Sequence, residues 1–135
     1  FTDSTEVWDF NRYTPDVVCV NLGTNDVSTL PYDTQLLEQG YRSFLKTLRG
    51  YYPKAKIILL SGCMLNGKPL ADVQTALNRV AEEAKAAGDK QVYRFDLTPT
   101  DGSLGYGACW HPSKAQQYKG AGELTPFIRT ITGWN

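Results

Sequence analysis

The only histidine of the chain lies in surroundings that suit a catalytic base. His111 is part of the glycine-containing segment 107–113 and is followed directly by Pro112. A histidine held on a tight turn can take up and return a proton near neutral pH. Far upstream, Asn25 follows an apolar run, and its side-chain amide can donate hydrogen bonds to a developing oxyanion. No serine of the chain stands in a setting that would make it the nucleophile.

Three apolar runs have the composition of parallel strands. The run 17–20 is apolar on both faces, which is typical of a fully buried, interior strand. The run 56–60 is of the same kind. In the run 92–97, polar and apolar residues alternate, so we expect a strand closer to the edge of the sheet.

Three helical patterns alternate with these runs. The first follows Asp33 and Thr34, either of which can cap the first turn. The second ends before Gly88, which is well placed as the left-handed residue past a helix end. The third begins where Ser113 and Gln116 are spaced as a capping box.

The alternation of strands and helices predicts an α/β fold, with a parallel sheet covered by helices on both faces. The length of 135 residues fits a single domain over residues 1–135. Open parallel sheets place their reactive groups beyond the carboxyl ends of the strands. Residues 21–26 follow the first strand, residues 61–64 follow the second, and the histidine loop follows the third. We therefore expect Asn25 and His111 on one rim of the sheet.

Composition excludes several classes of partner. Fourteen basic and fourteen acidic residues cancel, which argues against nucleic acid or an anionic membrane surface as the ligand. The longest apolar stretch is far shorter than the roughly 20 residues that span a bilayer. Cys19, Cys63 and Cys109 are too few and too widely spaced for a zinc cluster, so we expect no metal. Cys63 and Cys109 either form a disulfide that pins the histidine loop or remain two separate thiols.

Two segments of the sequence resemble signature blocks of one enzyme superfamily. Residues 16–26 resemble the third block of the GDSL, or SGNH, hydrolases, and residues 110–113 resemble the fifth. The sequence Asn-Leu-Gly-Thr-Asn-Asp at residues 21–26 and the tryptophan before His111 are most similar to the second family of carbohydrate esterases. Members of that family remove acetyl groups from polysaccharides such as xylan. The resemblance implies a three-layer α/β/α, flavodoxin-like SGNH hydrolase fold. It also implies that this chain is the C-terminal portion of such a domain, without its first strands.

The resemblance implies a serine esterase in which His111 activates the nucleophile and Asn25 contributes to the oxyanion hole. It calls for no cofactor, an acetylated carbohydrate as substrate, and an extracellular location. In this family the nucleophilic serine stands in a Gly-Asp-Ser block, which the chain lacks. Ser4 lies in a superficially similar Asp-Ser-Thr, but no apolar strand precedes it. We therefore expect the nucleophile on a preceding segment, and that segment or a second chain to pair with the free side of strand 17–20.

The group that orients the histidine ring is left open by the sequence. Many members of the superfamily place an aspartate three residues before the histidine, where this chain has Ala108. A backbone carbonyl can accept the imidazole N–H and fix the tautomer instead, as in the carbohydrate esterase family that the chain resembles. The remaining candidates for this role are Asp96 and Asp101.

The residues beside the predicted base and oxyanion donor are candidates for substrate contact. We expect Trp110 to line the site, because an indole face suits a sugar ring, although it could instead pack in the core. Gly23 and Thr24 are expected at the substrate from the same resemblance. Asp26 is expected to be a structural turn residue, and Asn25 itself has the alternative of stabilising its own loop.

Three functions are compatible with these residues. The first is the removal of O-acetyl groups from carbohydrate by an esterase whose serine lies outside this chain, so that the chain alone has little activity. The second is a non-catalytic carbohydrate-binding remnant of the fold. The third is a hydrolase of the same superfamily that acts on lipids or small esters.

Overall fold

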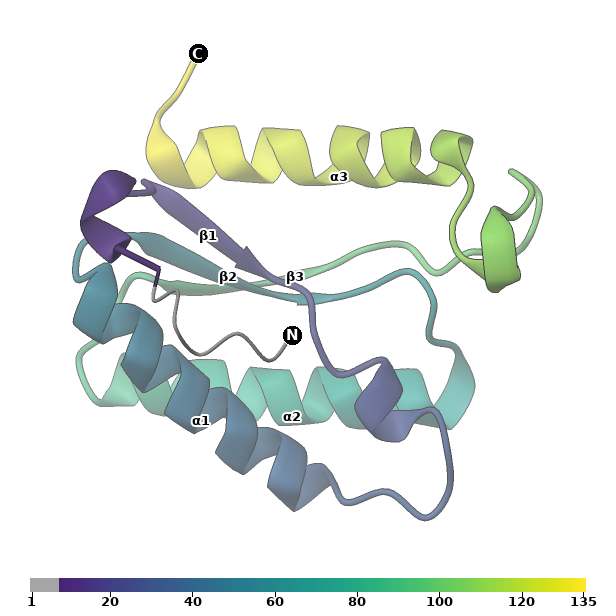
Figure 1. Cartoon of the computed structure of the whole chain (residues 1–135), viewed down its shortest axis with the longest axis horizontal. Coiled ribbons are helices and arrows are strands. Elements are labelled where there is room, and N and C mark those ends of the chain that lie inside the picture. The colour runs from purple at the N-terminus through teal and green to yellow at the C-terminus, as the bar shows by residue number, and fades with distance from the viewer. Residues whose placement is uncertain (1–7) are drawn as a thin grey trace.

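A three-stranded parallel sheet forms the centre of the computed structural model, which describes residues 8–135 (Figure 1). Strands β1 (Val17–Val20), β2 (Lys56–Ser61) and β3 (Val92–Asp96) are hydrogen-bonded in the order β1-β2-β3. The three strands expected from the sequence are confirmed, except that β2 ends one residue later and β3 one residue earlier than expected. Within the described chain, β2 is therefore the central strand.

Helices cover both faces of the sheet. Helices α1 (Thr34–Tyr51) and α2 (Gly67–Ala86) lie on one face, and α3 (Lys114–Thr132) lies on the opposite face (Figure 1). The element order and the three layers confirm the expected α/β architecture. Within residues 8–135, three short 3-10 helices occupy Phe10–Arg12, Asn25–Val27 and Ala108–Trp110.

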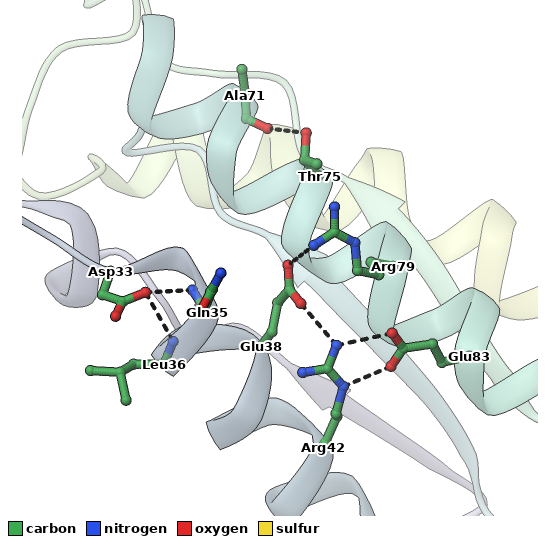
Figure 2. Close-up of polar contacts among 9 residues, drawn as sticks. All are labelled: Asp33, Gln35, Leu36, Glu38, Arg42, Ala71, Thr75, Arg79 and Glu83. Atoms are coloured by element: carbon green, nitrogen blue, oxygen red, sulfur yellow. Dashed lines mark hydrogen bonds and ion pairs between the residues drawn. The ribbon is translucent and has the colours of Figure 1, made fainter.

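The helix ends follow the expected capping chemistry. Asp33, rather than Thr34, caps α1, because its Oδ1 accepts hydrogen bonds from the backbone N–H groups of Gln35 (2.7 Å) and Leu36 (3.3 Å) (Figure 2). Such a cap stabilises a helix by about 1 kcal/mol. Gly88, just beyond α2, has a φ of +97°, the left-handed conformation that glycine adopts without a steric penalty.

The strands differ in how fully they are buried. Each residue of β2 from Ile57 to Leu60 is at most 4% exposed, because helices pack on both faces. In β1, Val20 is buried in the core, but Cys19 on the other face is exposed. The expectation that 17–20 is a fully buried, interior strand is thus wrong for the described chain. β1 pairs only with β2, and its outer side lacks a neighbouring strand among residues 8–135.

A buried carboxylate joins α1 to α2. Glu38 is 6% exposed, and its two carboxylate oxygens each lie 2.8 Å from an arginine, Arg42 on α1 and Arg79 on α2 (Figure 2). Arg42 also pairs with Glu83 of α2 at 2.6 Å, and these two carboxylates raise the pKa of its guanidinium. A buried charge is tolerated only when it is paired in this way. The network therefore fixes the two helices against each other beneath the sheet.

Candidate active site

Backbone hydrogen bonds close the segment around His111 into a compact loop. The N–H of Gly107 donates to the carbonyl of His111 (2.7 Å), and the N–H of His111 donates to the carbonyl of Ala108 (3.1 Å). An antiparallel bridge between Tyr106 and Pro112 holds the two ends of the loop together. The loop is therefore closed by contacts between residues on either side of the histidine.

The tip of this loop has an unusual backbone conformation. Cys109 and Trp110 have φ values of +51° and +61°, which side-chain-bearing residues rarely adopt. Each such residue costs roughly 1–2 kcal/mol. Both side chains are exposed, Trp110 by 77%, so burial does not offset the cost. Backbone strain that no packing offsets is found most often at functional sites. This loop is therefore the leading candidate for the functional site.

The imidazole ring of His111 is oriented by backbone carbonyls. Its Nδ1 lies 3.1 Å from the carbonyl oxygen of Ala108 and 3.2 Å from that of Cys109. Since a carbonyl only accepts hydrogen bonds, Nδ1 must carry the proton in the neutral ring. Nε2 is then left with a free lone pair, as a general base requires.

The two aspartates considered as orienting groups have other partners. Asp96 accepts a hydrogen bond from the Ser61 hydroxyl (2.6 Å) and forms an ion pair with Arg94. Asp101 accepts from the backbone N–H of Ser103 (2.9 Å), and hydrogen bonds from this serine hold the pKa of Asp101 below its usual value. Of the alternatives left open by the sequence, the structure therefore contains the carbonyl arrangement.

Ser113 connects the histidine loop to α3. Its hydroxyl oxygen accepts a hydrogen bond from the backbone N–H of Gln116 (3.2 Å), which confirms the Ser113 half of the expected capping box. The same hydroxyl donates to the carbonyl of Leu104 (2.7 Å), at the other end of the loop. The second bond was not expected from the sequence, because it joins residues nine positions apart. The Ser113 hydroxyl thus connects residues on both sides of His111 to α3.

The segment after β1 is held by a glycine and a tyrosine. Gly23 is buried with a φ of +101°, a backbone conformation that favours glycine. The Tyr41 hydroxyl accepts from the N–H of Leu22 (3.2 Å) and donates to the carbonyl of the same residue (3.0 Å). Tyr41 is also one of the apolar residues of α1 that pack in the core. Its position facing the end of β1 is what gives it this second role.

Asn25 opens the 3-10 turn that follows this segment. Its backbone carbonyl accepts from the N–H (3.4 Å) and the hydroxyl (2.9 Å) of Ser28, so the residue does stabilise its own turn. Its exposed side-chain amide makes no hydrogen bond to another residue in the range 8–135. Asp26 is exposed in the same turn and Thr24 is half-buried before it. The amide of Asn25 is therefore available to a ligand.

The three segments that follow the strands are in contact at the carboxyl end of the sheet. A Cβ on Gly62, after β2, would lie 2.7 Å from Oδ1 of the Asn21 side chain after β1, so these two segments approach each other closely. The carbonyl of Cys63 accepts from the N–H of Thr100, after β3, at 2.8 Å. The short helices Asn25–Val27 and Ala108–Trp110, the second of which ends just before His111, lie on the side where the strands end (Figure 1). The part of the chain that is described contains no hydrogen bond between these two residues.

The cysteines near this rim are separate thiols. Cys63 is half-buried and Cys109 is exposed, and each is free. Burial raises the pKa of the Cys63 thiol, which favours its neutral form. The structure therefore contains two separate thiols, and the alternative of a disulfide that pins the histidine loop is wrong for it.

Comparison with known proteins identifies the family. The GDSL-like lipase/acylhydrolase family matches residues 2–119, which is most of the chain. The chain belongs to this family. It is also 39% identical over 127 residues to the cellulase/esterase CelE of Acetivibrio thermocellus, and 33% identical over 136 residues to an acetylxylan esterase/glucomannan deacetylase of Cellvibrio japonicus. These alignments cover 94% and 98% of the chain, but 16% and 36% of the relatives.

A solved structure has the same fold as this GDSL family member. The family two carbohydrate esterase of Clostridium thermocellum in complex with cellohexaose matches with a TM-score of 0.94 and 38% identity. The match covers 98% of this chain and 41% of that one. The expected SGNH hydrolase fold is therefore confirmed. The chain spans less than half the length of the carbohydrate esterases that it resembles.

Within residues 8–135, no three or more His, Cys, Asp or Glu side chains are placed so that they could hold a metal ion. None of the helices in this range combines the length and the apolar composition needed to cross a bilayer. Ser4 lies outside the described residues.

Proposed function

We propose that this chain supplies the general base and one oxyanion donor of an esterase that removes acetyl groups from a xylan-like carbohydrate. The observation that carries the proposal is the geometry of His111, whose Nδ1 faces two carbonyl oxygens so that Nε2 is free to accept a proton. Family membership supports ester hydrolysis, and relatives named acetylxylan esterase support an acetylated carbohydrate as the substrate.

The proposed reaction has two steps. In the first, His111 Nε2 takes the proton of a serine hydroxyl as the oxygen attacks the acetyl carbonyl, and then gives that proton to the departing sugar oxygen. In the second, a water molecule attacks the acetyl-serine with the same proton relay and releases acetate. The amide of Asn25 donates to the oxyanion in both steps, a contribution worth about 10²–10³ in rate for one donor.

Trp110 is proposed to bind the sugar that carries the acetyl group. Its indole is 77% exposed, next to the proposed base, and an exposed aromatic face suits the apolar face of a pyranose ring. Gly23 and Thr24 are proposed to contact the substrate from the segment before Asn25. Because Gly23 is buried, such a contact would come from its backbone.

The serine is proposed to lie on a segment that is not in this chain and that pairs with the free side of β1. Two observations support this proposal. Among residues 8–135, β1 has a hydrogen-bonding partner on one side only. Beside the end of β1, a hollow of about 280 Å³ is lined mostly by apolar residues together with Asp26, and its side chains Leu22, Leu36 and Phe44 are 55%, 64% and 40% exposed. Both features are suited to a further strand and its connection.

Hydrolysis of a chromogenic acetate ester tests the proposal. The isolated 135-residue chain should hydrolyse it poorly or not at all, and the same chain preceded by its Gly-Asp-Ser segment should be active. Strong activity of the isolated chain would show that the nucleophile is local. A longer chain that binds oligosaccharide but never hydrolyses the ester would instead indicate a non-catalytic carbohydrate-binding protein.

A further inference from the structure

Two aromatic rings, those of Tyr106 and Trp110, form an open corner beside His111. The rings of Tyr106 and Trp110 are 5.4 Å apart between centroids, with an interplanar angle of 71°. This edge-to-face arrangement is one of the geometries that aromatic pairs prefer. Tyr106 is 46% exposed and Trp110 is 77% exposed, so the corner is open to solvent.

Tyr106 is fixed more firmly than Trp110. Its backbone forms the bridge to Pro112, and its ring lies against Gly102, where a Cβ would come within 2.9 Å of the phenolic oxygen. Gly102 has a φ of +82°, so a side chain there would be strained as well as crowded. Trp110, in contrast, projects from the strained tip of the loop. The tyrosine therefore serves as the fixed wall against which the indole rests.

The Tyr106 hydroxyl is also available for binding. It makes no hydrogen bond to any other residue between 8 and 135, although the hydroxyls of Tyr32 and Tyr41 are both hydrogen-bonded. A phenolic hydroxyl can donate one hydrogen bond and accept others. The corner thus combines an exposed indole face with a polar group that has free capacity.

We infer that Tyr106 is a positioning residue, which holds Trp110 in the orientation that binds a single pyranose ring and offers its own hydroxyl to that ring. This inference rests on the proposed role of Trp110 in sugar binding. A pyranose has an apolar C–H face and a rim of hydroxyl groups, so its face lies on the indole while its rim meets the phenol. A small aliphatic ester has no ring to place in this corner.

Titration of the natural protein with cellohexaose, followed by calorimetry, tests the inference. Tyr106→Ala should weaken binding about tenfold, which corresponds to about 1.4 kcal/mol. Tyr106→Phe keeps the wall and should lose only the hydroxyl, with a loss of about threefold or less. Tyr118→Ala removes a tyrosine that is 68% exposed on α3 and is the matched control, with no expected change.

The outcomes separate this inference from the proposed function. If the unmodified protein binds no oligosaccharide, or if Trp110→Ala leaves its affinity for cellohexaose unchanged, the proposed sugar-binding role of Trp110 fails. If the unmodified protein binds and Trp110→Ala abolishes binding, but Tyr106→Ala binds as tightly as the unmodified protein, the inference about Tyr106 is wrong.

The separate effects of Tyr106→Ala on KM and kcat distinguish a role in sugar binding from a purely structural role in the loop. With acetylated xylo-oligosaccharide, Tyr106→Ala should raise KM about tenfold and leave kcat within twofold, since the base and the oxyanion donor remain in place. Hydrolysis of triacetin, followed by titration of the released acid, should fall much less than deacetylation of the oligosaccharide, and the control Tyr118→Ala should change neither rate. An equal loss with both substrates would mean that the substitution damages the histidine loop, and would overturn the inference.

Discussion

The left-handed backbone at Cys109 predicts that glycine stabilises this position more than alanine does, although glycine is usually the less stabilising residue. At φ +51°, a residue with a Cβ costs roughly 1–2 kcal/mol relative to glycine. Glycine loses about 0.5–1 kcal/mol more in chain entropy on folding than alanine does. The steric term is the larger one, so Cys109→Gly should be more stable than Cys109→Ala by about 0.5–1 kcal/mol.

Urea unfolding of the two variants at pH 7 measures this difference, because the Cys109 side chain is exposed and its loss affects both variants equally. Ala71, exposed within α2, provides the control, where replacing alanine by glycine should cost about 1 kcal/mol. The sign of the alanine-to-glycine difference should therefore reverse between the two positions. If glycine is no better than alanine at position 109, the loop is not strained and the structural argument for its function fails.

Three further predictions concern the groups that hold the site and the helices. A ¹⁵N NMR spectrum of the single histidine should show Nδ1 protonated and Nε2 unprotonated in the neutral ring; the reverse assignment would contradict carbonyl orientation. Ser113→Ala should lower the free energy of unfolding by about 2 kcal/mol, from the lost cap and the lost bond to Leu104, while Ser113→Thr should recover most of it; equal stability of the three proteins would refute the double role. The pKa of Asp72 is held below 3.8 by hydrogen bonds from Lys68 and Tyr32, so its ionised form stabilises the fold above that pH and the contribution is lost on acidification. Asp72→Asn should make stability fall less steeply below pH 3.8 in urea titrations, and an unchanged slope would show that the pair contributes nothing.

The architecture could be predicted from the sequence because its signals are local. Apolar runs of strand length, helical spacing and capping residues such as Ser113 each depend on a few neighbouring residues. The position of β1 was harder to predict. Its residues are apolar on both faces, yet Cys19 is exposed, because burial depends on neighbours that a local pattern does not contain.

The candidate site was predictable in composition but not in geometry. His111 and Asn25 stood out by residue type and by resemblance, but the carbonyls that orient the ring depend on loop dihedral angles that no pattern encodes. The contact of Tyr41 with Leu22 spans 19 residues and was missed for the same reason. The Tyr106–Trp110 corner is likewise a product of the left-handed turn at the loop tip.

The most direct test of the proposed function is the deacetylation rate of the natural protein with His111→Ala, measured on acetylated xylo-oligosaccharide. Loss of a general base should lower kcat/KM by about 10²–10⁴-fold, while the affinity for cellohexaose stays the same because the tryptophan face is intact. A variant that deacetylates at the rate of the unmodified protein would show that His111 is not the base.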